Sequence, residues 1–147
     1  VTDKPIFSES FRHRRCLVPA DGFYEWESSD DGKYPYFIHL PSGSTFAMAG
    51  IWQNAQDGHD PGLSFCILTR SAHPSLLHLH HRMPLLVREE DRQAWLDPST
   101  PQARLSLILE GGRVAMDSYR VSKRVNATRN DDPGLQDASG ERQATLF

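Results

Sequence analysis

Residues 16–26 read CLVPADGFYEW, and residues 46–52 read FAMAGIW. Both are apolar runs with the length of a buried strand. The first run is interrupted once, by the Pro-Ala-Asp-Gly at positions 19–22, and these residue types favour a turn or a kink. The two stretches therefore predict three strands, two of which are joined by a tight bend.

More strand-like runs follow, separated by short turns rich in Gly, Pro and Asp. Residues 34–40 alternate, with Tyr36 and Ile38 on one face of the strand and Phe37 and His39 on the other. Strands spaced so closely favour an antiparallel meander or barrel over βαβ units. We therefore expect an α+β fold that is dominated by an antiparallel, barrel-like sheet with a few flanking helices.

The later half of the chain has helix signals. Residues 88–96 carry three acidic residues early, as the first turn of a helix often does. Thr100 followed by Pro101 predicts an N-cap and the first position of a second helix. Gly111 and Gly112 are expected to end that helix.

Composition limits the class of protein. The 147 residues have a formal net charge of −3, and 24% of them are charged, which fits one globular domain. No apolar run approaches the roughly 18 residues of a membrane helix, and no signal-peptide pattern is present. Cys16 and Cys66 are too few for a disulfide scaffold, so we expect buried thiols in a reducing compartment. The overall charge gives no sign of nucleic-acid binding, so evidence for it must come from local clusters of residues.

Glu25 lies between aromatic residues in the second predicted strand. Alternation places its side chain on the face of Phe23, opposite Tyr24 and Trp26. A carboxylate among aromatic rings is partly dehydrated, which suits general acid/base catalysis. The alternative is a glutamate at the edge of a strand that simply faces water.

Four histidines lie within nine residues, at positions 73, 78, 80 and 81. They suggest a zinc site, surface histidines on a loop, or a single catalytic imidazole near neutral pH. No CxxC or HExxH motif accompanies them. Arg82 stands where hydrolase H-x-H-x-D-H strings carry Asp, and a cation there opposes metal binding. We therefore predict no metal site.

Basic residues gather at three places along the chain. Such groups recognise phosphate even in an acidic protein, and a solvated surface is the alternative for each. The three places are Arg12, Arg14 and Arg15; Arg82; and Arg120, Lys123, Arg124 and Arg129.

Two long motifs together resemble the SOS response-associated peptidase (SRAP) family. Residues 14–26 (RRCLVPADGFYEW) fit its Cys-x-x-Pro-x-x-Gly-[Phe/Trp]-[Tyr/Phe]-Glu-Trp pattern, and residues 68–84 (LTRSAHPSLLHLHHRMP) contain its His-x-Arg-Met-Pro pattern. Val121, Ser122 and Val125 resemble a third, weaker segment. The resemblance spans most of residues 1–135.

The resemblance implies a protein that senses abasic sites in single-stranded DNA. In the family, a cysteine exposed by removal of the initiator Met attacks the ring-opened sugar through its α-amine and forms a Schiff base. Its thiol then closes a thiazolidine, which is a stable DNA–protein crosslink. An α-amine has a pKa near 8, so a useful fraction is neutral at pH 7. The resemblance implies no cofactor, no membrane association, and a cytoplasmic protein that joins the nucleoid during DNA damage.

The resemblance also assigns roles to residues. Glu25 matches the catalytic glutamate, which positions and deprotonates the α-amine. His80 matches the catalytic histidine, which acts as acid and base on the deoxyribose. Arg82 matches an arginine that holds the phosphate beside the lesion. Weaker candidates for phosphate contacts are Lys4, Arg14 and Arg15, and Thr69 falls in a supporting segment near the site.

The nucleophilic cysteine of the family is missing from these residues, and so is an Asn-Ala-Arg-x-Glu-Thr segment. Neither Cys16 nor Cys66 has a free α-amine. We therefore expect residues 1–135 to be the C-terminal two-thirds of one SRAP domain, with an upstream segment of the same protein as partner and residues 136–147 as a mobile tail. This chain alone is expected to fold poorly and to form no thiazolidine.

Two other functions remain open on the sequence. The first is a non-covalent module for single-stranded DNA that carries the same residues without using them. The second is a metal-dependent hydrolase built on the histidines, which metal analysis of the purified protein would test.

Overall fold

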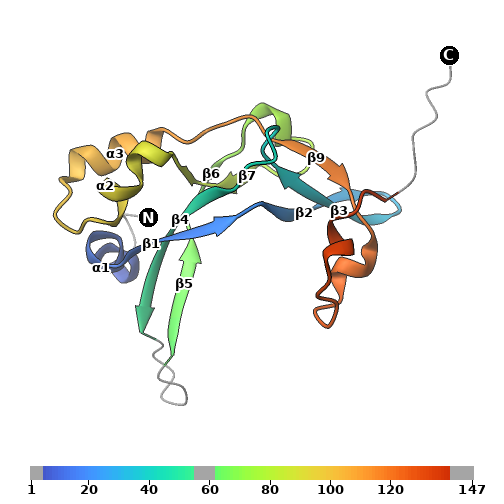
Figure 1. Ribbon diagram of the computed structural model, residues 1–147, viewed down its shortest axis with the longest axis horizontal. Coiled ribbons are helices and arrows are strands. Elements are labelled where there is room, and N and C mark those ends of the chain that lie inside the picture. Colours follow the sequence, from blue (N-terminus) through green and yellow to red (C-terminus); the bar gives the residue numbers. More distant parts are fainter. Residues whose placement is uncertain (1–4, 55–61, 140–147) are drawn as a thin grey trace.

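The computed structural model describes residues 5–54 and 62–139. Its helices are short, and strands make up most of the regular structure (Figure 1). The helices are α1 (Pro5–His13), α2 (Arg92–Leu96) and α3 (Gln102–Glu110), with 3-10 turns η1 (Pro74–Leu76), η2 (Glu89–Asp91), η3 (Lys123–Asn126) and η4 (Pro133–Gln136). The strands are β1 (Arg15–Ala20), β2 (Gly22–Ser29), β3 (Gly32–His39), β4 (Phe46–Asn54), β5 (Leu63–Ile67), β6 (Thr69–Ser71), β7 (Arg82–Pro84), β8 (Leu86–Val87) and β9 (Asp117–Arg120).

The strands form three antiparallel sheets. The first has the order β1-β4-β5 with β8 also paired to β4, the second has the order β2-β3-β9, and the third is the pair β6-β7. The expected α+β class with a mostly antiparallel sheet and few helices is confirmed. Over the described residues the sheets stay open and do not close into a barrel.

Strands β1 and β2 follow each other almost directly but belong to different sheets, as the predicted bend requires (Figure 1). Gly22 is needed at this crossing because the chains approach closely there. A Cβ atom at this position would lie 2.2 Å from Cζ of Phe37 and 2.7 Å from the carbonyl oxygen of Ile38. The bend therefore joins the two sheets at a fixed point.

Two hydrophobic clusters lie on opposite faces of β4, which is buried from Phe46 to Ile51. Ala49 and Ile51 face the first cluster, which lies under α1, α2 and α3 and includes Trp95. Phe46 and Met48 face the second cluster. That second cluster joins the first sheet to β2-β3 and to the segment that carries the histidines through Ile38, Ala72, Leu76, Leu79, Met83, Leu86 and Met116.

Several local expectations differ from the structure. Residues 5–13 form helix α1, which the sequence analysis did not predict. The N-cap of α3 is Pro101 rather than Thr100, whose hydroxyl instead donates to the carbonyl of Ala94 over 2.7 Å. Gly112 does end the helix region: its φ of +68° suits glycine, and a Cβ there would lie 1.9 Å from the Leu86 carbonyl oxygen.

The end of the described chain packs back onto the second sheet. Val121 pairs with Ala138, the Tyr119 hydroxyl donates to the Gln136 carbonyl over 2.8 Å, and Leu135 is buried. The expected mobile tail at 136–147 falls mostly on residues 140–147, outside the described part of the chain. No helix in the described part is long and apolar enough to cross a membrane.

Candidate functional site

Arg82 is held in place by Thr69. Arg82 lies on β7 and Thr69 lies on β6, and these two strands pair with each other. The register partner of Arg82 is Ser71, which follows Thr69 by two residues on β6. The guanidinium donates through Nε to Thr69 Oγ1 over 3.2 Å, and through Nη2 to Thr69 Oγ1 and to its carbonyl over 2.9 and 2.6 Å. Both side chains are exposed. Among the described residues Nη1 has no hydrogen-bond partner, so its donors are available to an anion.

His80 is oriented by the same strand. The backbone N–H of Arg82 donates to Nδ1 of His80 over 3.1 Å. Nδ1 also lies 3.2 Å from the carbonyl oxygen of Arg82, so it accepts from the N–H in one tautomer and donates to the carbonyl in the other. The His80 ring also lies 4.4 Å from the ring of His81, centroid to centroid. An imidazole with one nitrogen fixed and the other without a partner among the described residues is arranged for proton transfer.

Glu25 is half-buried on β2, as expected between aromatic residues. Its register partner on β3 is Tyr36, so the two side chains share one face of the sheet. The Tyr36 ring in turn lies edge-on to His78 at 6.3 Å. The sheet register and the Tyr36–His78 ring contact thus relate Glu25 to the histidine segment, and within the described residues no hydrogen bond or ion pair joins Glu25 to His80 or Arg82.

The opposite face of β2 holds the neighbours of Glu25, as alternation predicted. Trp26 donates its indole N–H to Asn126 Oδ1 over 2.8 Å, which ties β2 to η3. Tyr24 packs against Phe37, with 5.4 Å between the ring centroids. The aromatic residues around Glu25 therefore anchor the strand that carries it.

The weaker phosphate candidates have different surroundings. Lys4 lies outside the described residues. Arg14 forms a 3.3 Å ion pair with the exposed Glu9. Arg15 is only 6% exposed, and its guanidinium donates to four main-chain carbonyls, those of Phe11, Arg12, Trp95 and Asp97. A phosphate contact by Arg15 stays a prediction, and it would require these bonds to open.

The two cysteines also differ. Burial raises the pKa of Cys16, with a smaller contribution from Cys66. Cys66 is exposed and Cys16 is half-buried, so the expectation of two buried thiols is wrong for Cys66 and only partly met by Cys16. Over residues 5–54 and 62–139 no group of three or more His, Cys, Asp or Glu side chains is placed to hold a metal ion.

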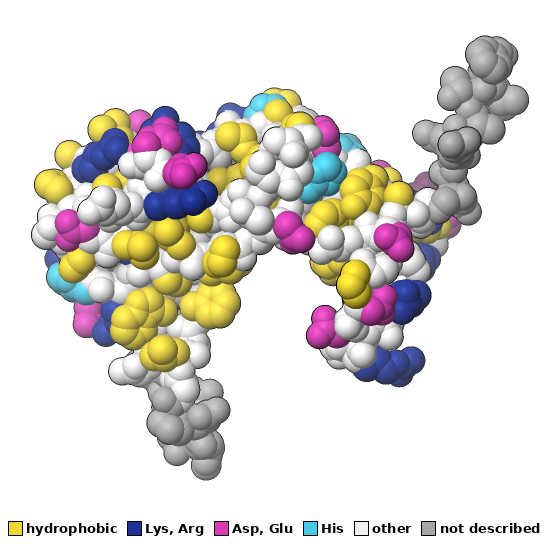
Figure 2. Space-filling view, in the orientation of Figure 1, with side chains coloured by type: hydrophobic (Ala, Val, Ile, Leu, Met, Phe, Trp, Pro, Cys, Tyr) yellow, Lys and Arg dark blue, Asp and Glu magenta, His cyan; other side chains and the backbone are white. Residues whose placement is uncertain are grey.

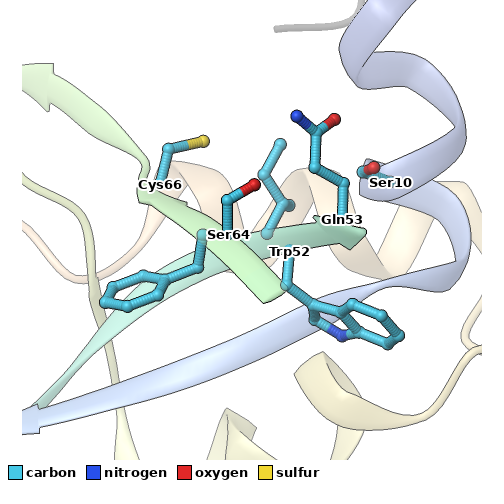
Figure 3. A pocket seen from close by; sticks show the side chains of 7 residues that line it. Ser10, Trp52, Gln53, Ser64 and Cys66 are labelled. Atoms are coloured by element: carbon cyan, nitrogen blue, oxygen red, sulfur yellow. The ribbon is translucent and has the colours of Figure 1, made fainter. Parts of the chain in front are cut away.

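A pocket of about 200 Å³ lies between α1 and the strands β4 and β5, and Cys66 is part of its lining. Figure 3 shows Gln53, Ser64 and Cys66 on the side of the sheet that faces Ser10, while Trp52 points to the other side. None of the site residues expected from the sequence lines this pocket.

The other face of β4 and β5 is apolar and bare at its far end. Leu63 is 70% exposed and Phe65 is 61% exposed, and both lie on the same face as Ile67 and Trp52. Figure 2 shows this apolar surface beside a hollow, across from the lobe formed by η3 and η4. We call Trp52, Leu63, Phe65 and Ile67 the bare face.

Sequence reasoning did not single out Tyr36 as a functional residue. Alternation placed it on one face of its strand, but only the pairing of β2 with β3 puts it opposite Glu25. Its contact with His78 also depends on the fold of a segment about forty residues later.

Comparisons with known proteins agree with the motifs. The sequence model of the family described as SOS response associated peptidase (SRAP) matches residues 1–128. Abasic site processing protein YoaM of Bacillus subtilis is 34% identical over 142 residues, which cover 94% of this chain and 63% of YoaM. Abasic site processing protein HMCES of Gallus gallus is 34% identical over 144 residues, with 82% of this chain and 42% of HMCES covered.

A solved structure of a protein from Bacteroides thetaiotaomicron superposes with a TM-score of 0.79 at 28% identity, and covers 95% of this chain and 62% of its own. The chain thus spans slightly less than two thirds of the length of these bacterial relatives. Because the family pattern extends over residues 1–128 and the relatives match nearly the whole sequence, the chain belongs to the SOS response associated peptidase family.

Proposed function

We propose that this chain supplies the acid/base and phosphate-binding residues of a protein that processes abasic sites in single-stranded DNA. The observation that carries the proposal is the joint placement of His80 and Arg82: the strand that orients the imidazole also holds a guanidinium with free donors. Names of relatives that are 34% identical support the same substrate. The proposed place of action is the cytoplasm, at the nucleoid.

The proposed reaction joins an α-amino thiol to the ring-opened sugar of the abasic site. The amine nitrogen adds to the aldehyde carbon, and the aldehyde oxygen leaves as water to give a Schiff base. The thiol sulfur then adds to the same carbon while its proton passes to the nitrogen, which closes a thiazolidine. This second step is intramolecular and therefore entropically favoured.

Each residue has one role in the proposal. Glu25 accepts the proton that the α-ammonium must lose before it attacks, and it serves the removal of the initiator Met and the reversal of the crosslink in the same way. His80 acts on the sugar as base and acid: on ring opening it takes the proton of the anomeric hydroxyl and returns it to the ring oxygen, and it later passes a proton of the attacking amine to the departing hydroxyl. Arg82 binds the phosphate next to the lesion through Nη1, and Thr69 keeps the guanidinium in position.

The test uses the product of the complete gene and single-stranded DNA with one abasic site. A band that survives boiling in denaturant is the expected result. Glu25→Gln and His80→Ala should each slow its formation roughly 100-fold or more while non-covalent affinity for the DNA stays within about twofold of the unaltered protein. Glu89→Gln and His13→Ala, which are exposed and distant, are the matched controls.

Two outcomes would contradict the proposal. Unchanged rates in both variants would remove the assigned roles of Glu25 and His80. Absence of any boiling-resistant band, with an N-terminal cysteine confirmed by intact mass, would favour the non-covalent DNA-binding module instead.

The nucleophile in this proposal belongs to a segment of the same protein outside these 147 residues. We propose that the segment packs on the bare face, where Leu63 and Phe65 leave apolar surface uncovered on an edge strand. The length of the relatives beyond the matched region supports a segment of sufficient size.

Hydrogen exchange tests this packing. In the product of the complete gene, the amides of β5 should exchange more slowly than in the 147-residue chain, because strand pairing and burial both protect amides. The amides of β4 serve as the internal reference. Equal exchange of β5 in the two proteins would contradict the packing, and a boiling-resistant adduct formed by the 147-residue chain would contradict the need for the segment.

A further inference from the structure

We propose that Tyr36 is a positioning residue that sets the placement of the His80–Arg82 segment relative to Glu25. The inference rests on the proposed function above and adds a residue to it. Tyr36 is the one side chain in the described part of the chain that is both the register partner of Glu25 and in ring contact with the histidine segment.

The first contact is on the side of β2. Tyr36 stands opposite Glu25, and its hydroxyl donates to Oε2 of Glu27 over 3.1 Å. Glu25 and Glu27 lie two residues apart on the same face of the strand. The hydroxyl thus ties Tyr36 to a second carboxylate of β2, which fixes the tyrosine side chain against the strand that carries Glu25. Burial raises the pKa of Tyr36, with the bond to Glu27 as a further cause, so the hydroxyl stays a donor through neutral pH.

The second contact is on the side of the histidines. The Tyr36 ring lies edge-on to His78, with centroids 6.3 Å apart. It also packs against the second hydrophobic cluster, which includes Leu79 and Met83. Leu79 directly precedes His80, and Met83 directly follows Arg82, so the proposed catalytic segment is fixed at both ends in the cluster that Tyr36 touches.

Tyr34 provides a close comparison on the same strand and the same face. Its hydroxyl also donates to a carboxylate, that of Asp31. Its ring, however, carries the guanidinium of Arg120 at 3.6 Å and the ammonium of Lys123 at 4.5 Å, instead of a histidine. Tyr34→Phe therefore removes a similar hydroxyl, and it keeps the ring that supports Arg120, which is also the register partner of Tyr36.

The experiment compares Tyr36→Leu, Tyr36→Phe and Tyr34→Phe in the product of the complete gene. Tyr36→Leu removes ring and hydroxyl and should slow crosslink formation roughly 10- to 100-fold, because small displacements of reacting groups are costly. Tyr36→Phe keeps the ring and should recover most of that loss, leaving a deficit of about two- to fivefold from the missing hydrogen bond. Tyr34→Phe should leave the rate unchanged, and all three should bind intact single-stranded DNA like the unaltered protein.

A second readout does not depend on activity. In NMR spectra, Tyr36→Leu should shift the His80 ring signals and the Arg82 amide, while Tyr34→Phe should leave both in place. If Tyr36→Leu does not fold, the crosslinking rates of Tyr36→Phe and Tyr34→Phe are compared instead. A lower rate in Tyr36→Phe alone supports the positioning role, and equal rates contradict it.

Unmoved His80 and Arg82 signals in a folded Tyr36→Leu protein would overturn the positioning role, as would equal rates for all variants. If the unaltered protein forms no crosslink, the proposed reaction fails and the NMR comparison alone decides whether Tyr36 positions the segment.

Discussion

The two faces of the β1-β4-β5 sheet differ in what covers them. One face carries Ile51 and packs under three helices, where Trp95 is completely buried. The other face is covered only near Phe46 and Met48, and at its far end Phe65 remains 61% exposed. The same kind of apolar strand residue thus stabilises the fold on one face and is available for contact on the other.

The largest effect is expected on the helix-covered face. Trp95→Ala should lower the free energy of unfolding by about 3–5 kcal/mol, because it empties a fully buried site. It also removes the edge-on contact with Phe11 and the 2.9 Å hydrogen bond to the Cys16 carbonyl. Denaturant unfolding of the product of the complete gene measures the change. A loss below about 1 kcal/mol would mean that this face contributes little to stability.

The next largest effect concerns the buried hydrogen bonds of Arg15, which lies on the same face. Arg15→Met keeps much of the side-chain volume but leaves four carbonyls without their charged donor, and should cost about 2–3 kcal/mol. Arg12→Met, an exposed neighbour, is the control and should change stability by less than about 0.5 kcal/mol. A stable Arg15→Met protein with weakened DNA affinity would instead support the phosphate role predicted for Arg15.

Phe65→Ser tests the bare face. Under conditions in which the 147-residue chain gives a cooperative unfolding transition, its effect there should stay within about 0.5 kcal/mol, because the ring is already in water. In the product of the complete gene it should cost about 1–3 kcal/mol if the proposed segment covers the ring. The two unfolding experiments together separate a bare face from a covered one, and equal small effects would argue against the covering segment.

The smallest effect concerns the thiols. Burial raises the pKa of Cys16, so at a given pH its reactive thiolate fraction is lower than that of an ordinary cysteine. A thiol-reactive probe near pH 7.5 should therefore label the exposed Cys66 first, and the labelling of Cys16 should reach its maximum rate only at higher pH. Mass spectrometry of the labelled peptides gives both rates, and faster labelling of Cys16 would contradict this order.

Local features of the fold could be predicted from the sequence because they depend on neighbouring residues. The bend between β1 and β2 follows from the residues at 19–22, and the face of Glu25 follows from strand alternation. Helix α1 escaped prediction because its stability comes from packing: Ser10 and Phe11 are buried against the rest of the protein. Local sequence does not contain that contact.

The surroundings of the site residues depend on distant parts of the chain. Two of the acceptors of Arg15 lie about eighty residues later, so its burial was not visible beside Arg14 in the sequence. Thr69 was expected only as a supporting residue, and the pairing of β6 with β7 shows how it supports Arg82. Whether Glu25, His80 and Arg82 act as assigned stays a prediction for the crosslinking experiments.

The close approach at Gly22 also bears on motion. A Cβ there would strike the Phe37 ring and the Ile38 carbonyl, so the chain leaves the bend in close contact with β3, and a hinge motion at the bend would have to break that packing. Phe23 of β2 and Met83 of β7 also pack in one hydrophobic cluster, so the carboxylate of Glu25 and the guanidinium of Arg82 are expected to keep one separation with or without DNA. Binding would proceed as lock-and-key recognition, in which the flexible DNA strand, rather than the protein, loses conformational entropy.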